Sequence, residues 1–160
     1  MPKKLYIASP LGFSEAGRIA YPEVLKIVKS EGYAVLDPWV LTPKKWIDNV
    51  IAMPEGPKKK KEWRRLNDII GRNNTGAIQQ SDGIVAVLDG VDVDSGVASE
   101  IGYGAGLGKR VLGYRGDFRL TGENEGCVVN LQVEYFIRMH NGIVVRKLED
   151  LKKNLRKVFG

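Results

Sequence analysis

The chain has 160 residues, of which 43% are hydrophobic and 28% charged, and these values predict one folded domain over residues 1–160. Its single cysteine, Cys127, and single histidine, His140, exclude an intrachain disulfide and a metal site built from several Cys or His ligands. The formal net charge of +6 makes an anionic ligand worth considering, although the basic residues gather in residues 57–65 and in the C-terminal tail.

Short apolar segments rich in β-branched residues alternate with segments of helical period. They predict strands at residues 4–8, 33–37, 83–89, 110–114 and 142–145. The intervening segments at 15–32 and 62–82 have the spacing of helices that cross from one strand to the next. This alternation predicts a parallel sheet with helices on both faces, and such sheets bind ligands beyond the carboxyl ends of their strands.

The first residues, MPKKLYIASP, enter a predicted strand at once and reach Pro10 too soon for a signal peptide. No apolar run approaches the roughly 20 residues needed to span a bilayer. We therefore expect a soluble, cytoplasmic protein without a membrane partner.

Residues 38–60 form a long connection after the second predicted strand, with four prolines and two tryptophans, Trp39 and Trp46. Long connections inside compact domains are often lids or binding loops, and we expect one here. The basic run that follows, residues 57–65, favours a solvated helix face because no nucleic-acid motif accompanies it. A nucleic-acid-binding module is the alternative, and it predicts salt-sensitive binding of polyanions.

The segment DVDSGVASEIGYGAGLGK, residues 92–109, follows the third predicted strand. Asp94 is placed to cap a helix, and Glu100 falls at the edge of that helix's buried face. Four alternate glycines weaken this helix and suggest that another backbone approaches it closely. Two nearby carboxylates without a metal suit chemistry at the anomeric carbon of a sugar, while capping and an exposed surface position remain the simpler roles.

Three segments together resemble the nucleoside 2-deoxyribosyltransferases in order and spacing: residues 5–13, LYIASPLGF; residues 77–109, which contain the acidic segment; and residues 128–137, VVNLQVEYFI. The resemblance covers most of the chain except residues 40–65. It implies a flavodoxin-like, Rossmann-like five-stranded parallel sheet that assembles as dimers or hexamers. It also implies a cofactor-free exchange of nucleobases on 2-deoxyribose through a covalent glycosyl-enzyme, with deoxynucleosides and free bases as small-molecule partners.

The resemblance assigns roles to four residues. Glu100 becomes the nucleophile that attacks C1′, and Tyr6 the residue that hydrogen-bonds and orients it. Asp94 binds a sugar hydroxyl, and Asn130 reaches from a neighbouring subunit to hold the 5′-hydroxyl. From the residues alone, Tyr6 equally suits a half-buried core position and Asn130 a helix cap or turn.

Two departures from the family pattern concern the base and the sugar. Asn74 stands where well-known bacterial members have a base-protonating aspartate, and an amide orients a base but is not a strong acid. Asp37 is an alternative acid, although an aspartate before a proline also begins turns. Gln132 replaces an apolar residue that some members have near the sugar, and this change bears on how the sugar hydroxyls are recognised. Trp39 and Trp46 each have two possible roles: to stack on the base, or to pack within the connection at residues 38–60.

A related N-glycoside hydrolase, acting on deoxynucleosides or their 5′-phosphates, is the competing enzymatic hypothesis. Asn130 suits a free 5′-hydroxyl, whereas a phosphate calls for donors such as arginine, and Arg115 and Arg119 follow the fourth predicted strand.

Overall fold

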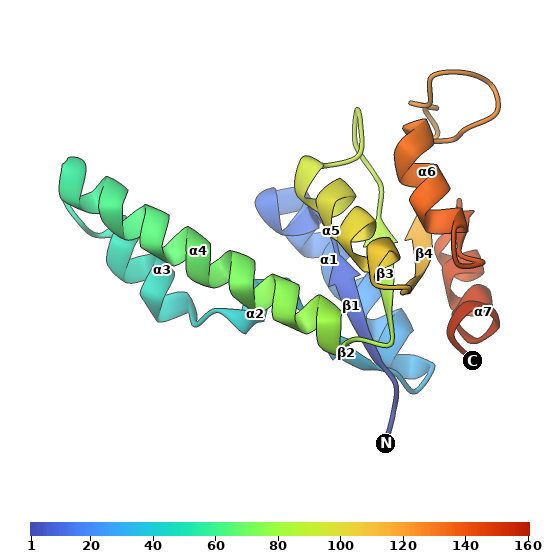
Figure 1. Cartoon of the computed structure of the whole chain (residues 1–160), viewed down its shortest axis with the longest axis horizontal. Helices are drawn as coiled ribbons and strands as arrows, with labels where there is room; N and C mark the ends of the chain where they lie inside the picture. Colours follow the sequence, from blue (N-terminus) through green and yellow to red (C-terminus); the bar gives the residue numbers. More distant parts are fainter.

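One sheet of five parallel strands forms the centre of the computed structural model, which describes residues 1–160 (Figure 1). The strands are β1 (Lys4–Ala8), β2 (Ala34–Leu36), β3 (Gly83–Val87), β4 (Arg110–Tyr114) and β5 (Ile143–Val145). Their order is β2-β1-β3-β4-β5, which is the order of flavodoxin-like folds. The predicted parallel sheet is thus confirmed, and its topological switch point lies between β1 and β3.

Helices cover both faces of the sheet. Helices α1 (Glu15–Ser30) and α7 (Leu148–Phe159) pack on one face, and α4 (Pro57–Gln80), α5 (Ser95–Gly106) and α6 (Leu131–Arg138) lie on the other. Alternate residues of β1 enter the two cores, with Leu5 on the α1 side and Tyr6 on the α5 side. Because both faces are buried, the strands are continuous apolar runs.

Residues 38–60 are a long connection, but most of this segment is helical where a loop was expected. It contains α2 (Pro38–Leu41) and α3 (Lys44–Ile51), and α4 already begins at Pro57. Pro38 and Pro57 occupy the first turns of their helices, where the missing N–H has no partner to lose. The prolines therefore start helices here.

Helix α3 and the first half of α4 run side by side and project from the sheet as an arm (Figure 1). The lysine-rich run lies at the start of α4, where Lys59 pairs with Glu55 at 2.7 Å. None of the helices combines the length and the apolar character that a membrane crossing requires.

Candidate active site

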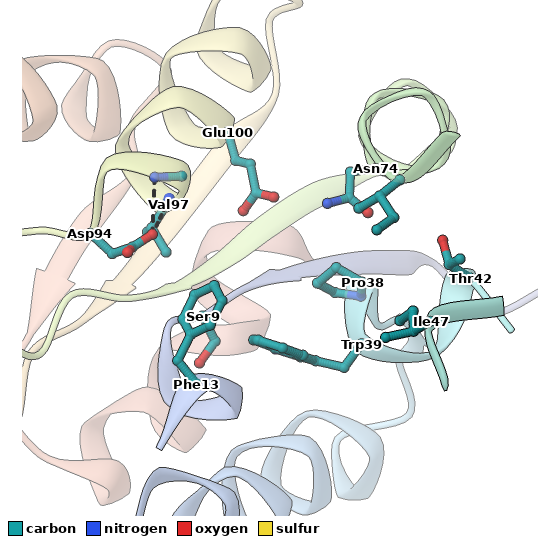
Figure 2. Close-up of a pocket in the computed structure, with 12 residues that line it drawn as sticks. Ser9, Phe13, Pro38, Trp39, Thr42, Ile47, Asn74, Asp94, Val97 and Glu100 are labelled. Carbon is teal, nitrogen blue, oxygen red and sulfur yellow. Dashed lines mark hydrogen bonds between the residues drawn. The ribbon is translucent and has the colours of Figure 1, made fainter. Parts of the chain in front are cut away.

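A cavity of about 310 Å³ opens where β1, β2 and β3 end, beside the switch point. It is enclosed by the segment after β1, by α2 and α3, by the middle of α4 and by the start of α5. The side chains that matter below are those of Phe13, Trp39, Asn74, Asp94 and Glu100 (Figure 2).

Glu100 and Tyr6 form a hydrogen-bonded pair at this cavity. Tyr6 is fully buried in β1, and its hydroxyl donates to Glu100 Oε1 at 2.6 Å. Burial raises the pKa of Glu100 to about 7; the Tyr6 hydrogen bond opposes this rise and the charge of Asp94 adds to it. The same burial and the neighbouring Glu100 raise the pKa of Tyr6, so the phenol stays protonated and remains the donor.

Asp94 caps helix α5, as its position in the sequence predicts. Its Oδ1 accepts from the backbone N–H groups of Gly96 at 2.9 Å and Val97 at 3.1 Å. The same side chain lies at the edge of the cavity near Glu100 (Figure 2). Capping uses one carboxylate oxygen and leaves Oδ2 for a ligand, so the structural role and a binding role are compatible.

The structure explains why glycine is required at two of the four alternate glycine positions in and after α5. A Cβ at Gly104 would lie 2.2 Å from Ile84 Cδ1, so a side chain there would require the buried Ile84 side chain of β3 to move. Gly108 ends the helix with a φ of +76°, which favours glycine. The close approach is thus to a strand side chain, where another backbone was expected.

Asp37 lies just outside the cavity and supports its aromatic wall. Its Oδ1 accepts from the Tyr21 hydroxyl at 2.8 Å and from the Trp39 backbone N–H at 3.0 Å. These two bonds hold the start of α2, and the Asp37 side chain does not line the cavity. The geometry therefore favours an anchor for α2 over an acid that protonates the base.

Trp39 lines the cavity and is 39% exposed, whereas Trp46 lies on the α3–α4 arm beside Val50 and Met53. The Phe13 ring meets Trp39 edge-on, with centroids 4.8 Å apart and planes at 80°. Phe13 was missed by the sequence reasoning, although an aromatic residue in the turn that follows a strand at the switch point was an available signal.

Asn74 projects from α4 into the cavity, across from Glu100 (Figure 2). Its Oδ1 is buried and has no hydrogen-bond partner. The adjacent Asn73 differs, because its Nδ2 donates to Thr42 Oγ1 at 3.0 Å and to Leu41 O at 3.3 Å.

Asn130 and Gln132 lie outside the cavity of their own chain. Asn130 caps α6, with Oδ1 accepting from the Gln132 and Val133 N–H groups and Nδ2 donating to Glu123 Oε1 at 2.6 Å. Gln132 is exposed. Within one chain, the structure does not bring either residue to Glu100.

The two arginines after β4 are engaged within the chain. Arg115 is fully buried and donates to the carbonyl oxygens of Leu88, Gly90 and Arg119. Arg119 pairs with Asp117, its Nε lying 2.9 Å from Oδ1. Neither guanidinium faces the cavity as a free anion donor. No cluster of three or more His, Cys, Asp or Glu side chains is placed to hold a metal ion.

The fold and the site define a class of α/β proteins that bind small molecules at the switch point beside a carboxylate held by a tyrosine. A family model for nucleoside 2-deoxyribosyltransferases matches residues 5–132. The chain belongs to that family, which confirms the resemblance found in the sequence.

Solved structures agree with this placement. A conserved protein from Enterococcus faecalis V583 is 26% identical with a TM-score of 0.69, over 98% of this chain and 99% of that chain. A 2-deoxyribosyltransferase from Leishmania mexicana is 25% identical with a TM-score of 0.62, over 93% of each chain.

A CMP N-glycosidase from Clostridium botulinum shares the fold, with a TM-score of 0.57 over 97% of this chain and 99% of that chain, at 15% identity. A comparison of the sequence with curated proteins gave no significant match. The family is therefore established by the family model, and the choice between base transfer and hydrolysis has to be argued from the site.

Proposed function

We propose that this protein exchanges nucleobases on 2-deoxyribose through a covalent intermediate on Glu100. The main support is the Tyr6–Glu100 pair, in which a buried phenol fixes one carboxylate oxygen at 2.6 Å beside a cavity. The other oxygen, Oε2, is then the one aimed at the substrate. A carboxylate held in this way is oriented before the substrate arrives, which lowers the cost of reaching the attacking geometry.

The exchange consists of two displacements at C1′. Glu100 forms a bond to C1′ as the N-glycosidic bond breaks, and the departing base keeps that electron pair and takes up a proton. A nitrogen of the entering base then attacks C1′, the ester bond to Glu100 breaks, and the entering base releases a proton. One proton is gained and one is lost, so no further reagent is needed, and the configuration at C1′ is retained.

The sugar hydroxyls are bound, in this proposal, by Asp94 and by Asn130 of a second copy. Asp94 has an oxygen left over from its cap and lies at the cavity edge beside Glu100. Asn130 does not line the cavity of its own chain, so its family role requires a second subunit. Gln132 follows it at the start of α6 and would enter the neighbouring site with it.

Hydrolysis, with water in place of the entering base, is the second candidate function, because the fold is shared with a CMP N-glycosidase. A 5′-phosphate would need cationic donors in the site. The two arginines after β4 are already engaged, Arg115 by carbonyl oxygens and Arg119 by Asp117. The arrangement therefore favours nucleosides that have a free 5′-hydroxyl.

A chromatographic assay tests the proposal. The purified protein is incubated with a deoxynucleoside donor and a different free base, in parallel with the donor alone and with the Glu100→Gln variant. We expect a new deoxynucleoside only when both substrates and Glu100 are present, and a deoxyribosyl adduct on Glu100 by mass spectrometry of the donor-only sample. If free base is released from the donor and no new nucleoside forms, the reaction is hydrolysis and not transfer. Exchange by Glu100→Gln at more than about a thousandth of the normal rate would refute the covalent route.

A further inference from the structure

The Asn74 amide is the one polar group in the cavity wall without a role in the chain. It makes no hydrogen bond to any other residue, and its Oδ1 is buried with no partner. Leaving a buried polar atom unpaired destabilises a folded protein, and in native structures such atoms commonly have a functional explanation. The location of this amide, across the cavity from Glu100 in a wall that also contains Trp39, indicates a bound ligand as that explanation (Figure 2).

The neighbouring Asn73 shows what a structural asparagine looks like on the same helix. Its amide nitrogen is used to fasten α4 to α2 through Thr42 and Leu41. Asn74 has no such partner, so its amide can turn about its last side-chain bond without losing a hydrogen bond. It can therefore present its N–H₂ and C=O in whichever order the ligand requires.

The chemistry at Glu100 determines which edge of a base faces Asn74. A purine that leaves from N9 becomes a better leaving group when N7 accepts a hydrogen bond, so N7 is expected to point at the nearest donor. Asn74 Nδ2 is that donor, and its carbonyl oxygen then faces the substituent at C6. An amino group at C6 donates to this oxygen, whereas an oxo group places two acceptors opposite each other.

We infer that Asn74 determines base specificity and that the site binds 6-aminopurines in preference to 6-oxopurines. This inference rests on the proposed function for the orientation of the base. Bidentate pairing of an asparagine with the N6 and N7 positions of a 6-aminopurine is a well-known arrangement in nucleic-acid recognition. When N7 and the C6 substituent face Asn74, the amide N–H and the carbonyl oxygen are both satisfied by a 6-aminopurine, whereas neither orientation of the amide satisfies both with a 6-oxopurine.

The experiment measures binding of two free bases, adenine and hypoxanthine, to the unmodified protein by calorimetry and by quenching of tryptophan fluorescence. We expect adenine to bind about tenfold or more tightly than hypoxanthine. In Asn74→Ala the two affinities should come within about threefold of each other. The matched control is Asn73→Ala, which removes the same group one position earlier. It should lower the melting temperature and leave the preference for adenine intact.

Equal binding of the two bases by the unmodified protein would overturn the inference, as would a full preference for adenine in Asn74→Ala. Binding needs no glycosyl transfer, so the readout is independent of the exchange assay. A preference for adenine without any exchange would contradict only the proposed reaction. Exchange that proceeds with no preference would contradict only the role of Asn74.

Discussion

The ionisation of Glu100 should govern the pH dependence of the reaction, because only the carboxylate is a nucleophile. With its pKa raised to about 7 by burial, kcat/KM should rise with pH and level off above that value. Tyr6→Phe removes the hydrogen bond that lowers this pKa, so the rising limb should move to higher pH. Asp94→Asn keeps an oxygen for the helix cap and removes the charge that raises the pKa, so the limb should move to lower pH.

The pH profiles of kcat/KM for these two variants check this prediction. Shifts in opposite directions are expected even if both variants are slower overall. A shared shift, or none, would show that Glu100 is not the group whose ionisation limits the rate.

The same carboxyl group should reduce the stability of the folded protein above neutral pH. Between its ordinary pKa of 4.5 and about 7, the folded protein holds a proton that the unfolded chain has released. The free energy of unfolding therefore falls as pH rises through this window. Glu100→Gln removes the buried charge, so it should be more stable than the parent by about 1–3 kcal/mol at pH 8.

Urea unfolding of both proteins at pH 8 and near pH 4 measures this difference. The gain should be absent near pH 4, where the parent carboxyl is protonated in both states. An equal difference in the free energy of unfolding at the two pH values would show that the substitution acts through packing and not through the charge. If Glu100→Gln were less stable than the parent at pH 8, burial of the charged Glu100 carboxylate would not be destabilising, which would contradict the prediction.

At the scale of elements, α2 positions the aromatic wall of the cavity. Asp37 holds the first turn of α2 through the Trp39 N–H and is itself held by the Tyr21 hydroxyl from α1. Tyr21→Phe removes one of these two bonds and should loosen Trp39 without touching Glu100. We expect KM for the base to rise by up to about tenfold, with kcat changed less than twofold. Steady-state kinetics separate the two constants, and a fall in kcat with KM unchanged would contradict a positioning role.

The sequence predicted the elements well where a single local pattern decides the structure. The β1 and β4 boundaries agree with the predicted segments 4–8 and 110–114, because apolar runs bounded by polar residues are strands buried on both faces. The α2–α3 segment was misjudged, since prolines that break a helix interior also begin helices. The sequence does not show which of these roles a given proline has.

The site was predictable to the extent that its residues belong to compact motifs. Tyr6 and Glu100 are 94 positions apart, and the resemblance proposed their contact before the geometry showed it. The hydrogen bond from Tyr21 to Asp37 and the unpaired state of the Asn74 oxygen could not be foreseen. Both depend on how α1, α2 and α4 pack, and no short pattern in the chain encodes that packing.

At the scale of the whole molecule, helix α6 presents an apolar stripe that its own chain does not cover. Leu131, Tyr135 and Met139 are spaced by four residues on one face and are 47%, 54% and 49% exposed. The stripe begins directly after Asn130, the residue assigned to a neighbouring site. Pairing of copies along this face would bury the stripe and bring Asn130 towards a second subunit.

Mixing two inactive variants tests whether sites are shared between subunits. Glu100→Gln lacks the nucleophile, and Asn130→Ser keeps an oxygen to cap α6 but is too short to reach another subunit. Each variant alone should have little exchange activity. After joint unfolding and refolding in equal amounts, half of the pairs are mixed and each has one intact site, so about a quarter of the normal activity should return. Activity no greater than the sum of the separate variants, in samples that light scattering shows to be paired, would place Asn130 outside the shared site.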